Sequence, residues 1–332
     1  MSDNPGVPET MRALRQPALG GPHLLTLVHD APVPAPGPGE VLLRVGAAGV
    51  NLADVMQTHG TYEGGPQAPY LAGFEGAGTV VALGPGTEGL AVGDRVIGAG
   101  SGAFAEYMTL PAAAALPLPE GWSEEEALGL VLNWATALAA LRLGRLARGE
   151  TVLVYAAAGG VGQAAVRLAK HFGATVLACA APEKHEAVLA LGADHVIDYR
   201  AVDTAAEVSR LTAGQGADVV LESVGGQVFR TSLAAARPVT GRVVVYGAAS
   251  GEAAVTNREL NFGPVQLIGL HIGVLAQTAP GLMGELVEEL GRLIEAGVYP
   301  PGQPTVFDLA DGPKALMTLA EGSTVGKLAL RP

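Results

Sequence analysis

Cysteine is nearly absent from this sequence. Cys179 is the single cysteine in 332 residues, so no disulfide can form within the chain, which favours a reducing compartment. Positive charge is also scarce, because 20 Lys and Arg stand against 32 Asp and Glu, a formal net charge of −12. Nucleic acids and anionic membrane surfaces are bound through an excess of Lys and Arg, so we expect neither as a main partner.

Long apolar segments are lacking as well. The longest, residues 127–141, is interrupted by Asn133 and Thr136. It falls short of the roughly 20 residues that a membrane-spanning helix needs. The N-terminus does not combine a charged start with an apolar stretch, as a signal peptide would. We therefore expect a soluble, cytoplasmic protein whose length favours two domains.

The first part of the chain is typical of a β-rich domain. LLTLV (24–28) and VLLRV (41–45) are strand-like, and TVVALG and DRVIG follow between glycine-rich turns. Regular short strands of this kind predict a barrel-like β domain. From residue 123 the pattern changes to a helix that Ser123 can cap, followed by alternating strands and helices.

Six short apolar strands are predicted between residues 151 and 272. They are TVLVY (151–155), TVLAC (175–179), HVIDY (195–199), ADVVLESV (217–224), GRVVVYG (241–247) and VQLIGLHI (265–272). Their alternation with helices predicts an α/β fold with a parallel, doubly wound sheet. The tail adds a predicted helix over residues 281–296 and a closing strand at KLALRP.

A glycine-rich turn joins the first of these strands to a helix in VLVYAAAGGVGQAAVRLAK. Gly159 and Gly162 hold the second and third glycine positions of G-x-G-x-x-G, with Ala157 at the first. Such a turn lets the backbone approach a pyrophosphate, which the amides at the helix start then bind. We therefore predict a dinucleotide site formed by Ala158, Gly159, Gly160, Val161 and Gly162.

The residues after the second and third strands favour NADP(H) over NAD(H). The second strand ends with Ala180 and Ala181, where an acid would bind the ribose 2′-hydroxyl. Lys184 follows, and Tyr199 ends the third strand, so a cation and an aromatic ring are placed to bind a 2′-phosphate. A solvated helix residue is the other interpretation of Lys184, and Glu183 fits the first turn of that helix.

Several motifs together resemble one known family over nearly the whole chain. They are GVNLAD (49–54), GTYEGGPQAPYLAGFEGAGTVVALGPG (60–86), VGDRV (92–96), GAFAEYM (102–108), the AAAGGVG turn and GKLAL near the end. The combination resembles the medium-chain dehydrogenase/reductase superfamily, and within it the zinc-free quinone oxidoreductase (zeta-crystallin-like) branch. The resemblance implies a GroES-like β-barrel-type catalytic domain (1–125 and 273–332). It also implies an inserted Rossmann domain with a six-stranded sheet (126–272).

The resemblance also implies that a catalytic zinc is missing. Zinc alcohol dehydrogenases of the superfamily have His-Glu at Phe74-Glu75, a cysteine at Asn51 and a further ligand near Leu132. Their four-cysteine structural loop is missing too, and the sequence contains no close His-x-x-x-His or Cys-x-x-Cys pair. We expect no zinc, and a structural role for Glu75 in hydrogen bonding backbone or polar groups.

Without zinc there is no Lewis acid to activate an alcohol. The reaction that needs least activation by the protein is hydride transfer from a nicotinamide to an already electrophilic acceptor. We therefore predict an NADPH-dependent reductase of quinones or α,β-unsaturated carbonyls. Two alternatives stay open: an enoyl-thioester reductase, and a non-catalytic NADPH-binding sensor or structural protein.

Candidate site residues follow from the family positions. Asn51 and Tyr62 are the catalytic candidates, as an orienting amide and a hydroxyl donor that also line the cofactor. Asn51 can also be interpreted as a turn residue, and Tyr62 as an aromatic loop residue without a chemical role. We expect Asp54 to be structural. The resemblance implies further cofactor contacts from Thr136, Val245, Tyr246, Gly247, Ala248, Leu270, His271, Ile272 and Lys327. His271 also fits a packed or solvated residue, and Lys327 a salt-bridged surface lysine. A homodimer or homotetramer that pairs the last Rossmann strand is expected from the same likeness.

Overall fold

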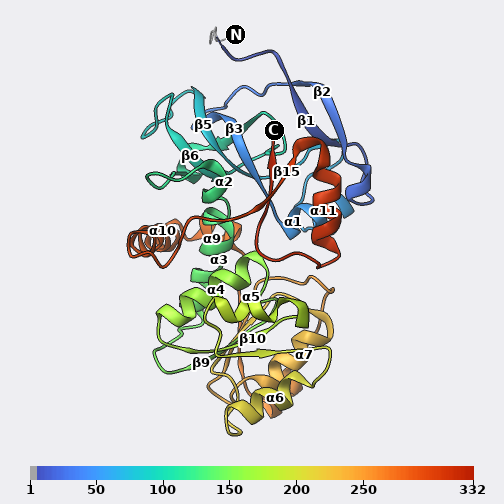
Figure 1. The fold of residues 1–332 in the computed structure, drawn as a ribbon, viewed down its shortest axis with the longest axis vertical. Helices are drawn as coiled ribbons and strands as arrows, with labels where there is room; N and C mark the ends of the chain where they lie inside the picture. Colours follow the sequence, from blue (N-terminus) through green and yellow to red (C-terminus); the bar gives the residue numbers. More distant parts are fainter. Residues whose placement is uncertain (1–5) are drawn as a thin grey trace. The chain divides into compact units, whose positions relative to one another are not determined.

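The computed structural model describes residues 6–332, and the chain divides into two compact units. The first unit comprises Met1–Leu132 and Pro301–Pro332, and the second comprises Asn133–Pro300. The second unit is therefore an insertion in the first, whose blue-to-green and red segments are separated in sequence by the green-to-orange part (Figure 1).

The first unit contains a seven-stranded sheet in the order β15-β16-β3-β5-β6-β8, with β7 pairing to β3, and a smaller sheet in the order β2-β1-β4. The strands are β1 (Thr10–Gln16), β2 (Thr26–Pro32), β3 (Glu40–Val50), β4 (Tyr70–Leu71), β5 (Glu75–Leu83), β6 (Arg95–Ala99), β7 (Tyr107–Pro111), β8 (Ala115–Pro117), β15 (Thr305–Asp308) and β16 (Leu328–Arg331). The helices are α1 (Leu52–His59), α2 (Glu124–Ala127) and α11 (Gly312–Ala320), with 3-10 turns at Pro22–Leu24, Ala112–Ala114 and Leu309–Asp311.

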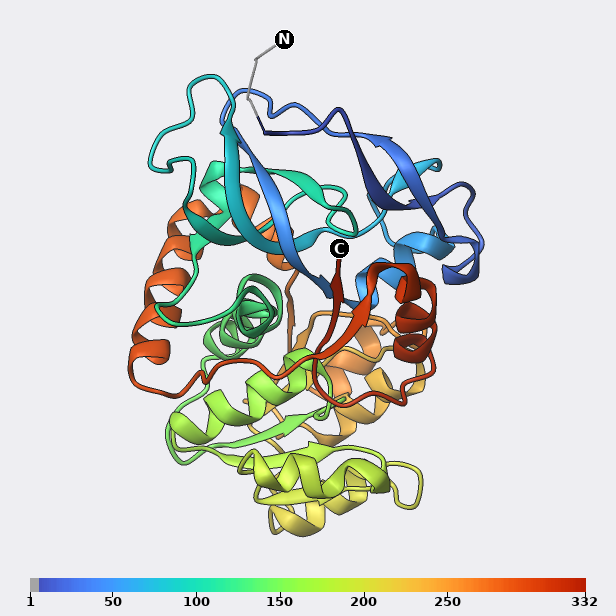
Figure 2. The same cartoon turned by 45° about the horizontal axis from the view of Figure 1, so that its top comes forward.

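The C-terminal segment completes the first unit. β16 pairs antiparallel with β3, which pairs antiparallel with β5, and the registers match Leu328 to Val50 and Gly49 to Glu75. In Figure 2 the dark red helix α11 and the red strand β16 lie beside the blue strands of this unit. The end of β3 and the beginnings of β5 and β16 therefore meet at one end of the sheet.

The second unit has a six-stranded parallel sheet in the order β11-β10-β9-β12-β13-β14, as predicted for a doubly wound fold. Its strands are β9 (Thr151–Val154), β10 (Thr175–Cys179), β11 (His195–Ile197), β12 (Val219–Glu222), β13 (Arg242–Val245) and β14 (Gln266–Gly269). Its helices are α3 (Ala135–Leu143), α4 (Gly160–His171), α5 (His185–Ala190), α6 (Thr204–Leu211), α7 (Gly226–Ala235), α8 (Asn257–Phe262), α9 (Ile272–Thr278) and α10 (Pro280–Glu295), with a 3-10 turn at Pro182–Lys184.

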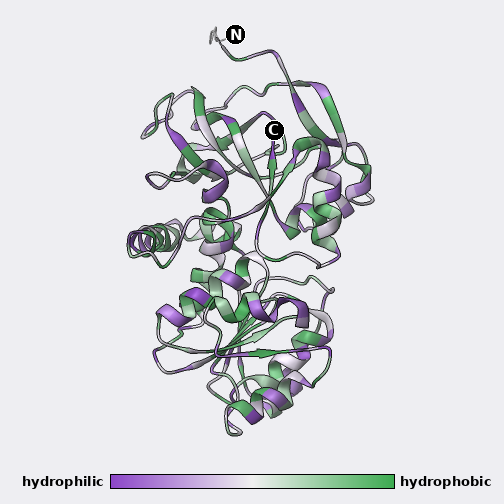
Figure 3. Cartoon of the chain, viewed as in Figure 1, coloured by the Kyte–Doolittle hydropathy of each residue, from purple (hydrophilic) through white to green (hydrophobic). Residues whose placement is uncertain are grey.

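The strands of this second sheet are apolar because helices cover them. β9, β10 and β12 are almost entirely buried, and Figure 3, in the same view as Figure 1, shows these strands as mainly hydrophobic, with hydrophilic stretches on the surrounding helices. Strands buried on both faces are typical of parallel sheets. β14 is the exception, because it lies at the sheet edge and three of its four residues are exposed.

The division between the units differs from the sequence-based boundaries. It lies at residues 132/133 and 300/301, whereas the sequence suggested 125/126 and 272/273. α10 belongs to the second unit because it packs on α3, where Arg142 forms an ion pair with Glu289. The Trp134 and Tyr299 rings also stack there with centroids 3.8 Å apart. These contacts join residues far apart in sequence, which pattern alone does not reveal.

One helical stretch, Glu124–Leu143, is long and apolar enough by composition to cross a membrane. It consists of α2, a π-helical turn at Leu130–Trp134 and α3. Of its most apolar window, 67% is buried inside the protein, which is typical of a core helix.

Candidate active site

A tight glycine turn joins β9 to α4. Gly159 is the N-cap of α4, and its own amide donates to Ala156 O at 2.9 Å. A Cβ at Gly162 would lie 2.3 Å from Ala156 O and 2.6 Å from Ala157 Cα, so only glycine lets the helix start pack this closely on the turn. A Cβ at Gly160 would meet the Asn133 side chain at 2.8 Å.

The chemistry of this turn fits a phosphate. The first amides of α4 have no partner within the helix, and the helix dipole adds positive potential at the same place. A Cβ at Gly159 would contact only Ala156 O, at 3.3 Å, so the backbone there is approachable. Ala157 at the first fingerprint position is fully buried, and its amide donates to Cys179 O. The predicted residues Ala158 to Gly162 thus lie together at this turn and at the start of α4.

Two cations lie together beyond the ends of β10 and β11. Lys184 ends a 3-10 turn, and the pKa of its ammonium is lowered mainly by burial and further by the charge of Arg200. Arg200 lies with its guanidinium 5.6 Å from the centre of the Tyr199 ring, and its Nη1 is 3.6 Å from Glu183 Oε1. Tyr199 was expected to end the third strand, but β11 ends at Ile197, so Tyr199 and Arg200 lie in the turn that follows it. Arg200 was not among the predicted residues. Ala180 accepts from His185 Nε2 through its carbonyl.

The other predicted cofactor contacts of the second unit lie at the ends of β13 and β14, on the other side of β9 from β10 and β11. Val245 ends β13 and its carbonyl accepts from Leu270 N at 2.9 Å, with Tyr246, Gly247 and Ala248 following the strand. His271 lies outside the strand in which it was expected, because β14 ends at Gly269. It is the N-cap of α9, where its Nδ1 accepts from Val274 N at 3.2 Å, and Ile272 begins that helix.

Thr136 lies in α3 and is buried. Trp134, just before it, is stacked on Tyr299, so its indole ring is held within the second unit.

A charged cluster lies in the first unit, where β3 ends and β5 and β16 begin. We call Asn51, Glu75 and Lys327 the polar cluster. The Glu75 side chain is fully buried, and its Oε1 accepts from Gly129 N at 2.7 Å. Its Oε2 accepts from Asn51 Nδ2 at 2.9 Å and from Lys327 Nζ at 2.5 Å. The expectation that Glu75 bonds backbone and polar groups is therefore confirmed.

Asn51 and Lys327 are joined to each other as well. Lys327 Nζ donates to Asn51 Oδ1 at 2.6 Å, and Asn51 Nδ2 also donates to Gly49 O at 3.3 Å. The Lys327 side chain is 12% exposed. The ion pair that the sequence left open for Lys327 therefore exists, but with a buried carboxylate rather than at the surface.

A second carboxyl group lies one helical turn further on. Asp54 is 2% exposed, and its Oδ2 accepts from Asn51 N at 2.8 Å, while its Oδ1 has no partner. Burial raises the pKa of Asp54 from 3.8 to about 8, against the opposing effects of the Asn51 hydrogen bond and the Lys327 charge. Asp54 is therefore mainly protonated at neutral pH. Burial and the charge of Asp54 also raise the pKa of Tyr62, which lies half-buried in the loop after α1.

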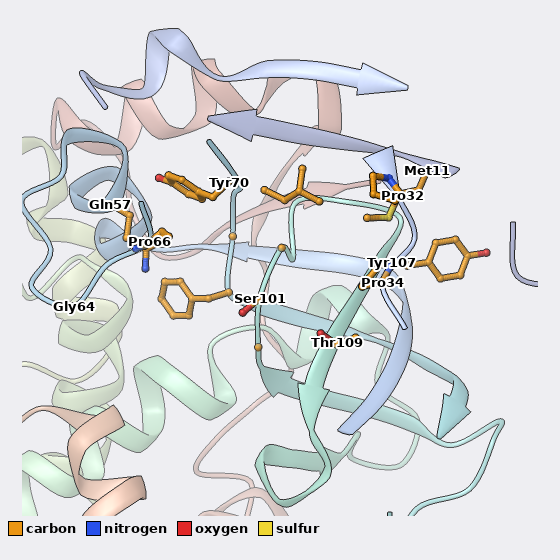
Figure 4. A pocket seen from close by; sticks show the side chains of 15 residues that line it. Met11, Pro32, Pro34, Gln57, Gly64, Pro66, Tyr70, Ser101, Tyr107 and Thr109 are labelled. Carbon is orange, nitrogen blue, oxygen red and sulfur yellow. The ribbon is translucent and has the colours of Figure 1, made fainter. Parts of the chain in front are cut away.

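A pocket of about 520 Å³ opens in the first unit. Its lining contains no charged side chain and consists of Met11, Pro32, Pro34, Gln57, Gly64, Pro66, Tyr70, Leu71, Gly73, Phe74, Gly100, Ser101, Gly102, Tyr107 and Thr109. Figure 4 shows Gln57, Pro66 and Tyr70 at one end and Met11, Pro32, Pro34 and Tyr107 at the other. None of Asn51, Glu75 and Lys327 is among these lining residues.

The fold and these sites define a class. A β-rich unit interrupted by a parallel-sheet unit, whose first strand runs through a glycine turn into a helix, is typical of dinucleotide-binding proteins. A family model described as an alcohol dehydrogenase GroES-like domain matches residues 37–120, and one described as a zinc-binding dehydrogenase matches residues 160–289.

Similar sequences are found among characterised proteins. The chain is 34% identical over 319 residues to the rat synaptic vesicle membrane protein VAT-1 homolog, covering 90% of this chain and 78% of that protein. A mycocerosic acid synthase-like polyketide synthase from Mycobacterium tuberculosis is 36% identical over 302 residues. That match covers 89% of this chain, which spans only 14% of the synthase.

Among solved structures, Escherichia coli quinone oxidoreductase complexed with NADPH has a TM-score of 0.88 at 29% identity, covering 97% of this chain and 100% of that one. The CurK enoyl reductase has a TM-score of 0.87 at 30% identity, covering 97% and 99%. The chain belongs to the medium-chain dehydrogenase/reductase superfamily, in its zinc-free quinone oxidoreductase branch.

The description of one family model implies zinc, and the donor set here does not fit it. Within residues 6–332 no group of three His, Cys, Asp or Glu side chains is placed to hold a metal ion. Both oxygens of Glu75 are engaged by protein donors, and one of those donors is an ammonium group. Asp54 is mainly protonated at neutral pH, and the thiol of Cys179 is buried in β10 with a pKa raised to about 12 by burial.

Proposed function

We propose that this protein is a zinc-independent, NADPH-dependent reductase that transfers hydride to quinones or α,β-unsaturated carbonyls. The bound cofactor supplies the hydride. The glycine turn at Gly159–Gly162 would hold its pyrophosphate, and Lys184 with Arg200 would hold the 2′-phosphate. The complex of the E. coli relative with NADPH supports this choice of cofactor.

The observation that carries the substrate class is the uncharged pocket at Phe74. Aromatic and proline side chains with a few hydroxyl groups suit a flat, neutral molecule, and about 520 Å³ is within the usual range for small ligands. A phosphorylated substrate would find no cation in that lining. The pocket therefore supports a small quinone or enone as partner.

Tyr62 and Asn51 have different proposed roles. Tyr62 remains the proposed hydroxyl donor, because it lies in the loop after α1 and keeps its proton through neutral pH. Both hydrogens of the Asn51 amide are committed to Glu75 and Gly49, so we assign Asn51 to positioning within the polar cluster. The contacts of Thr136, Val245–Ala248 and Leu270–Ile272 with the nicotinamide side stay proposals.

A second candidate function is enoyl-thioester reduction. The similarity to the CurK enoyl reductase favours it, because the same hydride chemistry acts on an acyl thioester. The uncharged pocket weighs against a phosphopantetheine carrier at that place. A non-catalytic NADPH-binding role is the third outcome of the test below. We further propose a cytoplasmic homodimer or homotetramer, for which the exposed edge strand β14 is the candidate interface.

The test follows NADPH and NADH absorbance with the purified chain and a panel of acceptors: an ortho-quinone, a para-quinone, a simple enone and an enoyl thioester. A primary alcohol with NADP tests the reverse direction. Quinone or enone turnover that prefers NADPH and survives a chelator is expected. Faster turnover of the thioester would favour the second candidate, and tight NADPH binding without turnover would favour the third. Alcohol oxidation abolished by the chelator would overturn the proposal.

A further inference from the structure

The pocket of the first unit has two unlike ends (Figure 4). One end carries the side-chain amide of Gln57, beside Tyr70. The other end is lined by Met11, Pro32, Pro34 and Tyr107. Met11 is 2% exposed and belongs to a small apolar cluster against which Leu71 and Tyr107 pack. A ligand that fills the whole pocket therefore needs one polar and one apolar end.

Gln57 has a defined place at the polar end because the backbone around it is fixed. It lies in the last turn of α1, which Gly60 closes by donating from its amide to Gln57 O at 3.0 Å. At the other end of this helix, Asp54 Oδ2 accepts from Asn51 N. The side chain passes beside Gly65, where a Cβ would contact Gln57 Cγ at 3.6 Å.

The Gln57 amide is the polar group that a ligand meets at this end. It has no hydrogen-bond partner within residues 6–332, and its side chain is half-buried. The hydroxyl of Tyr70 also lacks a partner there, but its oxygen is shielded from solvent. An amide offers two N–H donors and one acceptor oxygen, so it can donate to a carbonyl oxygen or accept from a hydroxyl group.

The size of the pocket exceeds what a minimal acceptor fills. A volume of about 520 Å³ lies in the range of pockets that enclose drug-sized ligands. A quinone of a single ring, or a short enone, would leave much of this space to water. Apolar surface gains binding free energy only where it displaces such water, which favours an acceptor that reaches the apolar end.

We propose that the pocket takes a carbonyl acceptor with an apolar extension, an alkyl chain or a second ring. The Gln57 amide donates a hydrogen bond to the carbonyl oxygen, and the extension lies toward Met11 and Pro34. This rests on the proposed function and narrows its substrate class. Gln57 is then a residue that determines specificity, through contact with the substrate.

The first test varies only the extension. Purified wild type with NADPH is given three methyl ketones that are enones with a methyl, propyl or pentyl group on the β-carbon. The value of kcat/KM should rise by up to about fourfold for each added methylene, as expected for methylenes removed from water. Equal values of kcat/KM along the series would overturn the apolar extension.

The second test closes the apolar end. Pro34→Trp should lower kcat/KM for the pentyl enone to that for the methyl enone, whose own value should stay unchanged. Ala35→Trp places the same side chain at the next residue, which is exposed and does not line the pocket, and should behave as wild type. A gain with chain length that persists in folded Pro34→Trp would place the extension elsewhere and overturn the proposal.

The third test removes the hydrogen bond. Gln57→Met keeps the length of the side chain and should raise KM for the pentyl enone about 3- to 10-fold with kcat retained, the usual effect of one neutral hydrogen bond in binding. Gln67→Met, at an exposed glutamine outside the pocket lining, should leave KM unchanged. If KM rises in Ser101→Ala but not in Gln57→Met, the carbonyl lies at the middle of the pocket and the role of Gln57 is overturned.

The possible results separate this inference from the proposed function. Turnover without any dependence on chain length overturns the inference and leaves the proposed function standing. If no acceptor is turned over, the proposed function fails, and saturation-transfer NMR with the saturated pentyl ketone tests the pocket alone. A signal that Pro34→Trp removes and Ala35→Trp retains supports the pocket. Absence of a signal, or a signal that both variants retain, overturns it.

Discussion

Replacing Gly49 by alanine tests whether the ion pair is packed as tightly as the structure indicates. The added Cβ would lie 2.3 Å from Glu75 Oε2, whereas real Cβ contacts essentially never fall below 3.0 Å, so the carboxylate must retreat. The Lys327 side chain at 2.9 Å blocks one direction, and the carboxylate is held from the other side by Gly129 N. Overpacking of this kind costs about 2 kcal/mol.

For a unit of this size, that loss corresponds to a fall in the unfolding temperature of roughly 4 to 8 °C. Thermal unfolding followed by circular dichroism measures it directly. Gly284→Ala in α10 is the matched control, because a Cβ there meets nothing within 4 Å and a helical alanine should be neutral or stabilising. An unfolding temperature for Gly49→Ala equal to that of wild type would refute the packing described for the cluster.

Three further predictions concern charge and assembly. Because the pKa of Asp54 is raised from 3.8 to about 8, the folded state binds more protons than the unfolded state between these values. The free energy of unfolding should therefore fall by up to ~1.4 kcal/mol per pH unit as the pH rises through this window. In urea unfolding, Asp54→Asn should lose this dependence; parallel wild-type and variant curves would contradict the assignment. Arg200→Met should weaken NADPH binding by roughly tenfold or more and leave NADH binding unchanged in calorimetric titration. Equal losses for both cofactors would exclude a 2′-phosphate contact. Leu267→Glu on β14 should reduce the mass found by light scattering to that of one chain, whereas an unchanged oligomer would place the interface elsewhere.

The second unit was largely predictable from the sequence because its strands are buried on both faces. Apolar runs such as TVLVY and TVLAC became β9 and β10 within a residue or two, and the glycine turn between β9 and α4 carries its own local signature. Helices such as α6 and α7 were not predicted, because short amphipathic segments between turns have weak patterns. The first helix, α1, was also missed, although Asn51 and Asp54 form a capping box at its start.

The polar cluster could not be predicted, because its members are connected by sheet register and not by spacing. Lys327 and Asn51 are 276 positions apart, and GKLAL reads equally well as a surface strand. Only the pairing of Leu328 with Val50 brings the ammonium to the amide. Arg200 is the opposite case, because it directly follows the predicted residue Tyr199 and sequence order alone places the two side by side.

The charges of the polar cluster and of Asp54 are balanced within the first unit. Glu75 and Lys327 cancel, and the raised pKa of Asp54 keeps this third group neutral at physiological pH. An ionised Asp54 would add a negative charge beside the cluster and repel the buried carboxylate of Glu75. Burial, which disfavours the carboxylate form, therefore keeps a second negative charge out of this part of the fold. The same burial explains why a carboxyl group one turn from Asn51 can remain without disturbing the Glu75–Lys327 ion pair.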